Sequence, residues 1–106
     1  MNAHLLILYP TPKDAKTFER VYREEHLPYA GPRLKGATGV VSKRVASAPG
    51  GLPPYHAISD VTFPSLEALQ ACAASKGGQE ALAHAASIST GGPPVVVIVT
   101  DDLAAS

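Results

Sequence analysis

The nine residues YHAISDVTF, from Tyr55 to Phe63, decide the fold. Side chains alternate between the two faces of a strand, and here the alternation separates two kinds of residue. The small or apolar set comprises Tyr55, Ala57, Ser59, Val61 and Phe63. The other set comprises His56, Ile58, Asp60 and Thr62. We expect helices to pack on the first set, which would leave the second set on the opposite face of a sheet.

Three further strands are predicted around this segment. The loop 48–54, rich in proline and glycine, connects it to a strand over residues 36–45 that is rich in Val, Thr and Ser. Short apolar runs at 4–9 and 95–99 predict two more strands. The run at 95–99 is the most apolar in the chain, and we therefore expect it to be a central strand.

Two helices are predicted between the strands. The first begins after Asp14, whose carboxylate can accept the free amide N–H groups of a first turn. It should end near Leu27, because Pro28 disfavours a helical conformation in the residue before it, and residues 29–35 should form a loop. The second helix begins after Ser65, is interrupted at Gly77-Gly78, and resumes over Glu80–Ser87.

The order β-α-β-β-α-β is typical of a ferredoxin-like α+β sandwich, in which two helices cover one face of a four-stranded antiparallel sheet. A chain of 106 residues has the length of one domain, so we expect a single domain over 1–106 with a flexible tail at 101–106. The first and last strands are apolar on both faces. The open face therefore needs a cover, and we expect a homodimer joined sheet to sheet by a two-fold interface.

The composition excludes several classes of partner. Lys and Arg number 9, as do Asp and Glu, and a chain without net charge is a poor partner for nucleic acid. The single cysteine, Cys72, excludes an internal disulfide. The apolar run at 5–8 is far too short for a signal sequence or a membrane span. We expect a cytoplasmic protein with no membrane partner.

Three titratable side chains are the candidate catalytic residues: His26, His56 and Asp60. The alternation places His56 and Asp60 together, in a cavity between the two sheets of the dimer. His26 lies four residues after Tyr22 and should therefore also point inward. Burial lowers the pKa of a histidine and raises that of an aspartic acid, which favours proton transfer near neutral pH. The alternatives are that His56 and Asp60 are solvated near an edge, and that His26 only caps its helix.

The candidate ligand-binding residues are Tyr9, Tyr22, Ile58, Thr62 and Thr90. Tyr9 either presents its phenol to the cavity or closes the core, and Thr90 belongs to a Thr-Gly-Gly segment that either approaches a ligand or forms an ordinary turn. The four histidines are scattered without a zinc-like spacing, although a site shared by His26 and His56 remains an alternative. We expect neither a metal nor a cofactor.

Five segments together resemble the EthD family: Leu5–Pro10, Phe18–Pro28, Pro53–His56, Ser65–Leu69 and Thr90–Gly92. The most specific element is Tyr22-x-x-x-His26-x-Pro28. The resemblance implies a dimeric α/β barrel with a pocket for a small hydrophobic or aromatic molecule, and it marks His26 as functional. The family is named from a cluster for degradation of ethyl tert-butyl ether, and similar barrels include isomerases, cyclases, cofactor-free oxygenases and haem-handling enzymes.

Two functions follow from these expectations. In the first, the protein is a cofactor-free enzyme of the isomerase, decarboxylase or cyclase type, with His26 as general acid or base, His56 as its partner and Asp60 as the orienting group. In the second, the protein is a non-catalytic carrier that sequesters a hydrophobic metabolite. Haem handling through an imidazole ligand is a third alternative.

Overall fold

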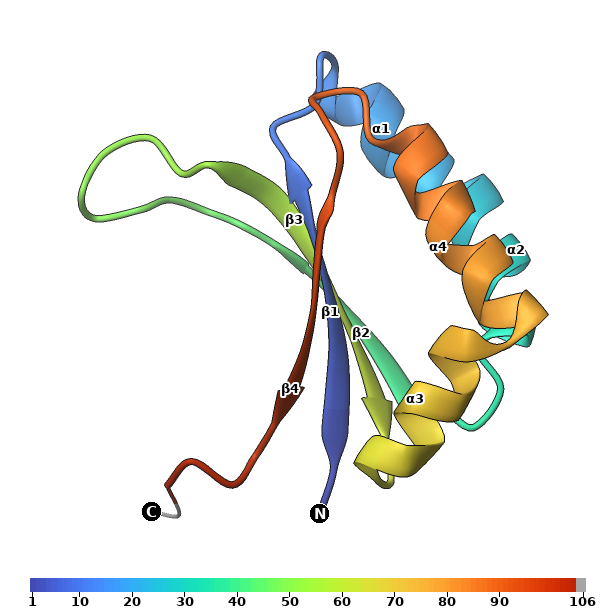
Figure 1. The fold of residues 1–106 in the computed structure, drawn as a ribbon. Coiled ribbons are helices and arrows are strands. Elements are labelled where there is room, and N and C mark those ends of the chain that lie inside the picture. The colour runs from blue at the N-terminus through green and yellow to red at the C-terminus, as the bar shows by residue number, and fades with distance from the viewer. Residues whose placement is uncertain (105–106) are drawn as a thin grey trace.

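One antiparallel sheet with the strand order β2-β3-β1-β4 carries all the helices on one of its faces (Figure 1). The computed structural model describes residues 1–104. The strands are β1 (Ala3–Pro10), β2 (Gly39–Arg44), β3 (Tyr55–Phe63) and β4 (Val95–Thr100). The helices are α1 (Ala15–Val21), η1 (Tyr22–His26), α2 (Leu27–Ala30), η2 (Gly31–Arg33), α3 (Leu66–Ala74) and α4 (Lys76–Ile88). The predicted ferredoxin-like α+β fold is confirmed.

Strand β3 lies between β1 and β2 and has the predicted bounds. Ser59, Val61 and Phe63 are buried under the helices, as expected, and Asp60 and Thr62 face the other way. The alternation fails at the start of the strand. The register with β1 shifts between Tyr9 and Pro10, because Tyr9 pairs with Ala57 whereas Pro10 pairs with Tyr55. His56 is thus an extra residue in a β-bulge, which redirects its side chain.

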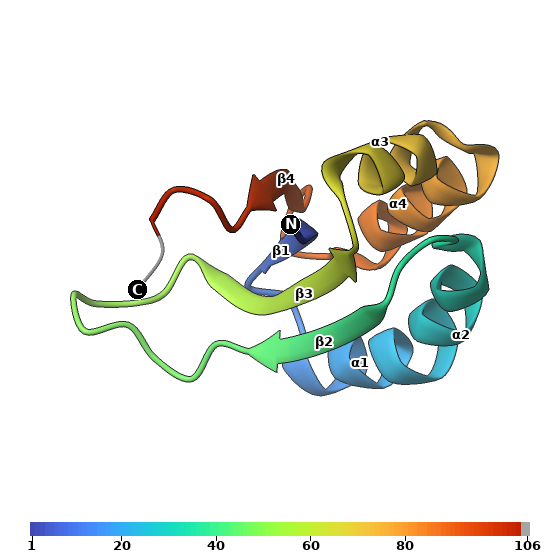
Figure 2. The same ribbon diagram turned by 90° about the horizontal axis from the view of Figure 1, so that it is seen from below.

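The helical segment after β1 is longer than predicted. It passes without a break from α1 through η1 and α2 to η2, so the expected end near Leu27 and the expected loop at 29–35 are both wrong (Figure 2). The turn η1 is a π-helix, in which the Leu27 N–H bonds to the Tyr22 carbonyl oxygen five residues earlier. Pro28 then falls in the first turn of α2, a position at which helices tolerate proline.

The second helical segment is a pair of helices separated at Ser75. The expected interruption at Gly77-Gly78 is wrong, because both glycines lie within the first turn of α4. The predicted cap is confirmed, because the Ser65 hydroxyl accepts a hydrogen bond from the Ala68 N–H at 3.1 Å. Ser75 caps α4 in the same way through the Gly78 N–H, at 3.0 Å. A Cβ atom at Gly78 would collide with the carbonyl oxygen of Cys72, so only glycine allows α3 and α4 to approach this closely.

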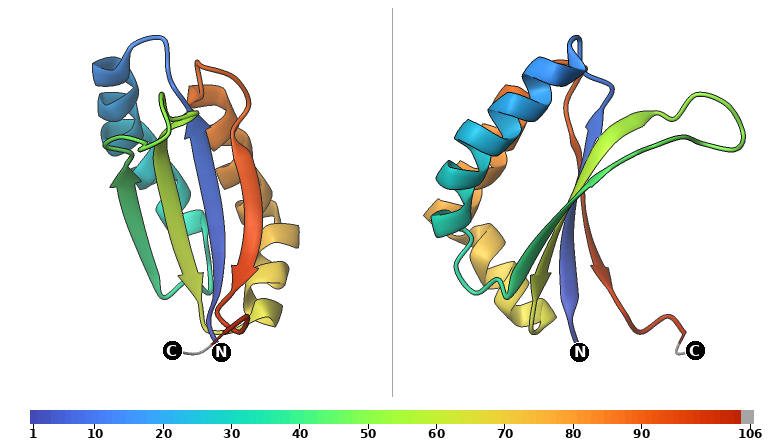
Figure 3. Two further views of the ribbon diagram at one scale, coloured as in Figure 1. Left: turned by 90° about the vertical axis from the view of Figure 1, so that its left-hand side faces the viewer. Right: turned by 180° about the vertical axis from the view of Figure 1, so that it is seen from behind.

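Strand β4 is an edge strand, and the expectation that it is central is wrong (Figure 3). Its residues Val95–Ile98 are 40–46% exposed. The central position next to β3 belongs to β1, whose alternate residues Leu5 and Ile7 are buried in the core. The apolar character of β4 therefore does not reflect burial on both faces within one chain.

The core lies between the sheet and the helices. Its largest fully buried side chains are Tyr9, Val61, Phe63 and Leu69. Among residues 1–104, no helix has both the length and the apolar character that crossing a bilayer requires. Part of the predicted tail at 101–106, namely residues 105–106, lies outside the described residues.

Candidate functional site

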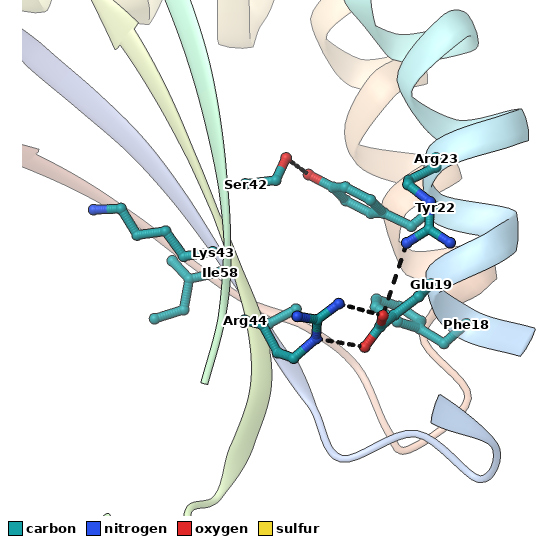
Figure 4. A pocket seen from close by; sticks show the side chains of 9 residues that line it. Phe18, Glu19, Tyr22, Arg23, Ser42, Lys43, Arg44 and Ile58 are labelled. Carbon is teal, nitrogen blue, oxygen red and sulfur yellow. Dashed lines mark hydrogen bonds and ion pairs between the residues drawn. The ribbon is translucent and has the colours of Figure 1, made fainter. Parts of the chain in front are cut away.

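An open cleft lies between the helical layer and the β2–β3 edge of the sheet. Its accessible volume is about 220 Å³. We call it the outer cleft, and its principal side chains are Phe18, Glu19, Tyr22, Arg23, Ser42 and Arg44 (Figure 4). The cleft exists because the helices cover β1 and β3 but leave the edge strand β2 exposed along its whole length.

A carboxylate surrounded by cationic groups lies at one end of the outer cleft. Glu19 accepts two hydrogen bonds from the Arg44 guanidinium, at 2.9 and 2.7 Å, and one from His56 Nε2 at 2.8 Å. Arg23 lies 3.7 Å from the same carboxylate. The hydrogen bonds from Arg44, and next those from His56, hold the pKa of Glu19 at about 2. Glu19 is therefore ionised at any ordinary pH and is too weak a base to take a proton from a ligand.

The bulge in β3 brings His56 to the helix side of the sheet. Its ring lies edge-on to Phe18, with the centroids 5.9 Å apart. A carboxylate can only accept hydrogen bonds, so Nε2 carries the hydrogen in the bond to Glu19. In the neutral imidazole this leaves Nδ1 as the proton acceptor. Glu19 thus selects the tautomer of His56 and orients its ring.

Tyr22 connects the helical layer to both strands of the β2–β3 edge. Its hydroxyl hydrogen-bonds to Ser42 Oγ at 2.6 Å and to Ser59 Oγ at 2.7 Å. Behind it lies Tyr9, which is fully buried, and burial raises the pKa of the Tyr9 phenol above its ordinary value. The rings of Tyr9 and Tyr22 meet edge to face at 5.9 Å, yet the Tyr9 hydroxyl has no hydrogen-bond partner among residues 1–104.

His26 lies deeper, beside a second and much smaller cavity of about 30 Å³ that Tyr22 and Ser59 also line. Its Nδ1 hydrogen-bonds to Nδ1 of His84 at 2.9 Å, and its ring packs against Tyr22 at 5.5 Å. Burial, assisted by the nearby His84, lowers the pKa of His26 to about 4. His26 is therefore neutral at pH 7, and Tyr22 stands between it and the outer cleft.

A separate polar cluster occupies the open face of the sheet, on the side without helices. Asp60 pairs with His4 Nδ1 at 2.8 Å and lies 3.9 Å from Lys43 Nζ. The second nitrogen of His4 contacts Asp101 at 3.0 Å, and the hydrogen bonds that His4 donates to Asp101 and Asp60 raise the pKa of His4. Thr62 belongs to the same cluster, because its hydroxyl lies 3.3 Å from His4 Nδ1.

The expected convergence of His26, His56 and Asp60 on one cavity is therefore wrong. Asp60 lies on the open face, whereas the bulge turns His56 toward Glu19 on the helix side. The two histidines share that side but contact different neighbours. His26 packs against Tyr22 and His84, and His56 packs against Phe18.

The predicted ligand-binding residues also separate. Tyr22 lines the outer cleft and Tyr9 supports it from behind. Ile58 borders the cleft, but its side chain points to the opposite side of the strands (Figure 4). Thr62 lies on the open face. Thr90 accepts a hydrogen bond from the Lys13 N–H at 3.1 Å, between two loops and outside the outer cleft.

Sequence reasoning missed Glu19, Ser42, Arg44 and His4. Glu19 and Arg44 are 25 positions apart, and only the placement of β2 beside α1 brings them together. His4 had a usable signal, because it shares the alternation of β1 and pairs directly with Thr62. Among the described residues, no group of three or more His, Cys, Asp or Glu side chains is placed to hold a metal ion.

Comparison with known proteins identifies the fold in several solved structures. An EthD family protein from Bacillus halodurans C-125 is 21% identical with a TM-score of 0.81, and the match covers 95% of this chain and 99% of that one. SnoaB, a cofactor-independent oxygenase from Streptomyces nogalater, is 12% identical with a TM-score of 0.65 and coverages of 97% and 95%. A dimeric ferredoxin-like protein of unknown function from Jannaschia sp. CCS1 is 22% identical with a TM-score of 0.63 and coverages of 93% and 97%.

The search of curated proteins found no match. The family model described as the EthD domain matches residues 11–87, which include both strands of the β2–β3 edge and all the helices except Ile88, the last residue of α4. Since this match extends over well more than half of the sequence, the chain belongs to the EthD family.

Proposed function

We propose that this EthD-family protein binds a small aromatic metabolite in the outer cleft and transforms it by cofactor-independent acid–base catalysis. The observation that carries the proposal is the hydrogen bond from His56 to Glu19, which lines the cleft beside an aromatic wall formed by Phe18 and Tyr22. His56 adjoins the cleft through Glu19 and is not itself one of the lining residues. A volume of about 220 Å³ is smaller than the roughly 300–1,000 Å³ of pockets for drug-sized ligands. It suits a molecule of one or two rings.

His56 is the proton-transferring group in this proposal. Its Nδ1 is left as the base once Nε2 donates to Glu19, and the bound carboxylate stabilises the imidazolium that forms. Ser42, whose hydroxyl bonds to Tyr22 and lines the cleft, offers a hydrogen-bonding group to a carbonyl or phenolic oxygen of the ligand. Such a site fits isomerisation, decarboxylation or cyclisation. Support for chemistry without a cofactor on this fold comes from the likeness to SnoaB.

His26 and Asp60, the other two candidates, receive different roles. A neutral His26 behind Tyr22 supports the inner wall of the cleft, and Asp60 organises the polar cluster of the open face. Neither residue touches the ligand in this proposal.

A screen for ligands tests the proposal first. We would measure thermal shifts with phenols, aromatic aldehydes, quinones and lactones, because a ligand at a hundredfold excess over its Kd stabilises the folded state by about 2.7 kcal/mol. Each hit would then be assayed for turnover with the wild type, with His56→Gln and with the control His4→Gln, which changes a histidine on the open face. We expect His56→Gln to bind the hit and lose turnover, and His4→Gln to retain it. Full turnover by His56→Gln, or no hit at all, would overturn the proposal.

A carrier without chemistry is the second candidate, and the state of Glu19 favours it. The one carboxylate of the cleft is fully engaged by Arg44 and His56, so it contributes no base. A carrier would show saturable binding of the same compounds and no product on prolonged incubation.

We also propose that two chains form a homodimer through the open faces of their sheets. That face presents an apolar surface around the polar cluster, made of Leu6, Leu8, Val41, Ile58, Val95 and Val97. A dimer of this kind explains why the edge strand β4 is apolar, and the dimeric relative of the same fold supports it. Sedimentation at micromolar concentration should give the mass of two chains. The mass of one chain would contradict the proposal.

A further inference from the structure

We propose that the ligand of the outer cleft is an anion, namely a small aromatic compound that carries one carboxylate. This inference rests on the proposed function, because it concerns the same cleft. It goes further by naming the ionic group of the ligand and the two residues that recognise it, Arg23 and Arg44.

The charges around the cleft do not cancel. Two guanidinium groups, one from η1 and one from β2, both pair with the single carboxylate of Glu19 (Figure 4). Lys43 does not contribute, since its side chain points to the open face, where it pairs with Asp60. One positive charge is therefore left over at the mouth of a cleft whose wall is aromatic. Such a surplus attracts a monoanion.

Both guanidinium groups keep donors for a ligand. Arg44 uses Nε and Nη2 on Glu19, and its Nη1 has no hydrogen bond within residues 1–104. Arg23 lies 3.7 Å from Glu19, which is an ion pair and not a hydrogen bond. The N–H groups of Arg23 therefore also make no hydrogen bond within residues 1–104. The two side chains are 61% and 64% exposed, which places them at the mouth rather than in the interior. A ligand carboxylate would bind at the mouth beside Glu19, to the donors of Arg23 and Arg44 that Glu19 leaves free, while the ring of the ligand packs on Phe18 and Tyr22.

The geometry favours a carboxylate over other anions. Arg23 keeps its planar fork, which matches the two oxygens of a carboxylate, and Arg44 adds Nη1, since its Nε and Nη2 are already bonded to Glu19. Phosphate groups also bind to arginine, but a phosphate monoester carries nearly two negative charges at neutral pH, and the cleft offers a surplus of one. The hydroxyl of Ser42 supplies a further hydrogen bond to an oxygen of the ligand.

The test compares three probes of the same ring size: benzoate, benzamide and phenyl phosphate. Binding would be measured by titration of backbone amide signals in NMR, following the residues of the cleft. We expect benzoate to bind about fivefold more tightly than benzamide at low salt, a magnitude typical of exposed ion pairs. The difference should shrink in 0.5 M salt, because the screening length falls well below 10 Å.

Matched variants locate the charge. Arg23→Gln and Arg44→Gln should each weaken benzoate binding about fivefold and leave benzamide binding unchanged. Arg20→Gln is the control, since it removes the same charge from the preceding turn but does not line the cleft. Its affinity for benzoate should remain within twofold of the wild type.

The possible failures are distinguishable. If benzamide binds as tightly as benzoate, the anionic class is wrong while the proposed aromatic site stands. If Arg23→Gln and Arg44→Gln both still prefer benzoate to benzamide, the inference is wrong. It is also wrong if Arg20→Gln loses this preference to the same extent as the two cleft variants. Tighter binding of phenyl phosphate would replace the carboxylate by a phosphate ester. If no aromatic compound binds, the proposed function falls together with the inference.

Discussion

Acidification should destabilise this protein through His26, well above the pH at which carboxylates titrate. The pKa of His26 is about 4 in the folded protein, against an ordinary value of 6.5. The unfolded chain therefore takes up a proton first, and the stabilisation is complete above pH 6.5 and lost as the pH falls toward 4. The difference between the pKa of His26 in the folded and in the unfolded chain corresponds to about 3 kcal/mol in the free energy of unfolding. About 2 kcal/mol of this stabilisation is lost between pH 7.5 and 5.0.

Urea unfolding at several pH values between 7.5 and 5.0, at one protein concentration, measures this loss. His26→Gln should be less stable at pH 7.5, but its stability should fall by about 2 kcal/mol less than that of the wild type over this range. His4 acts in the opposite direction, because its raised pKa stabilises the folded protein at low pH and ceases to do so as the pH rises. The control His4→Gln should therefore show a steeper loss on acidification. Parallel curves for the wild type and His26→Gln would refute the reasoning.

Three further perturbations test the packing and the assembly. Tyr22→Phe should lower the free energy of unfolding by about 1–3 kcal/mol, because the Ser59 hydroxyl, in a side chain only 3% exposed, loses its hydrogen-bond partner. A double-mutant cycle with Ser59→Ala measures this bond, and strictly additive effects of the two substitutions would argue against it. Gly78→Ala should cost about 1–3 kcal/mol or more through collision with the backbone of α3, so an unchanged urea midpoint would contradict the close helix contact. Val97→Lys should shift the sedimenting mass from two chains to one. Val96 is about equally exposed but lies on the other face of β4, so Val96→Lys should leave the mass unchanged. The same effect from both substitutions would count against the open-face dimer.

The element order could be predicted from the sequence because alternation and capping are local signals. Tyr55–Phe63 has the bounds that its alternation predicts, and Ser65 caps the helix that it was expected to cap. The bulge at His56 has no such signal. It arises from the pairing of β3 with β1 near Tyr9, a contact between segments far apart in the chain.

Two other errors share a cause. A proline such as Pro28 normally ends a helix, but here it follows a π-turn and lies in the first turn of α2, a position at which helices tolerate proline. The valines of β4 are apolar enough for a central strand. Strand β4 lies at an edge because it pairs only with β1 within the sheet of one chain, and the other side of β1 is taken by β3. Both sequence patterns are present in the chain. Where the helix ends and where the strand lies in the sheet depend on tertiary contacts that the local sequence does not specify.

The candidate site was predictable only in part. Tyr22 was found because it lies on the apolar stripe of its helix, and that stripe faces the sheet. The pair formed by Glu19 and Arg44 was not found, since each is an ordinary charged residue until β2 is placed beside α1. Electrostatic sites of this kind become visible only in three dimensions.

The π-turn η1 also determines where this chain tolerates a change in length. A π-turn holds about one residue more than an α-turn, so deletion of one residue from Tyr22–His26 would restore α-helical hydrogen bonding; the following helix would keep its facing, but the spacing between Tyr22 and His26 would change. The rings of Tyr22 and His26, whose centroids are now 5.5 Å apart, would then lose their contact. The loop at 45–54 projects beyond the sheet (Figures 1 and 2), where an insertion or deletion displaces no packed element. Homologous chains and engineered variants should therefore vary freely in the length of this loop and hold the spacing within η1 fixed.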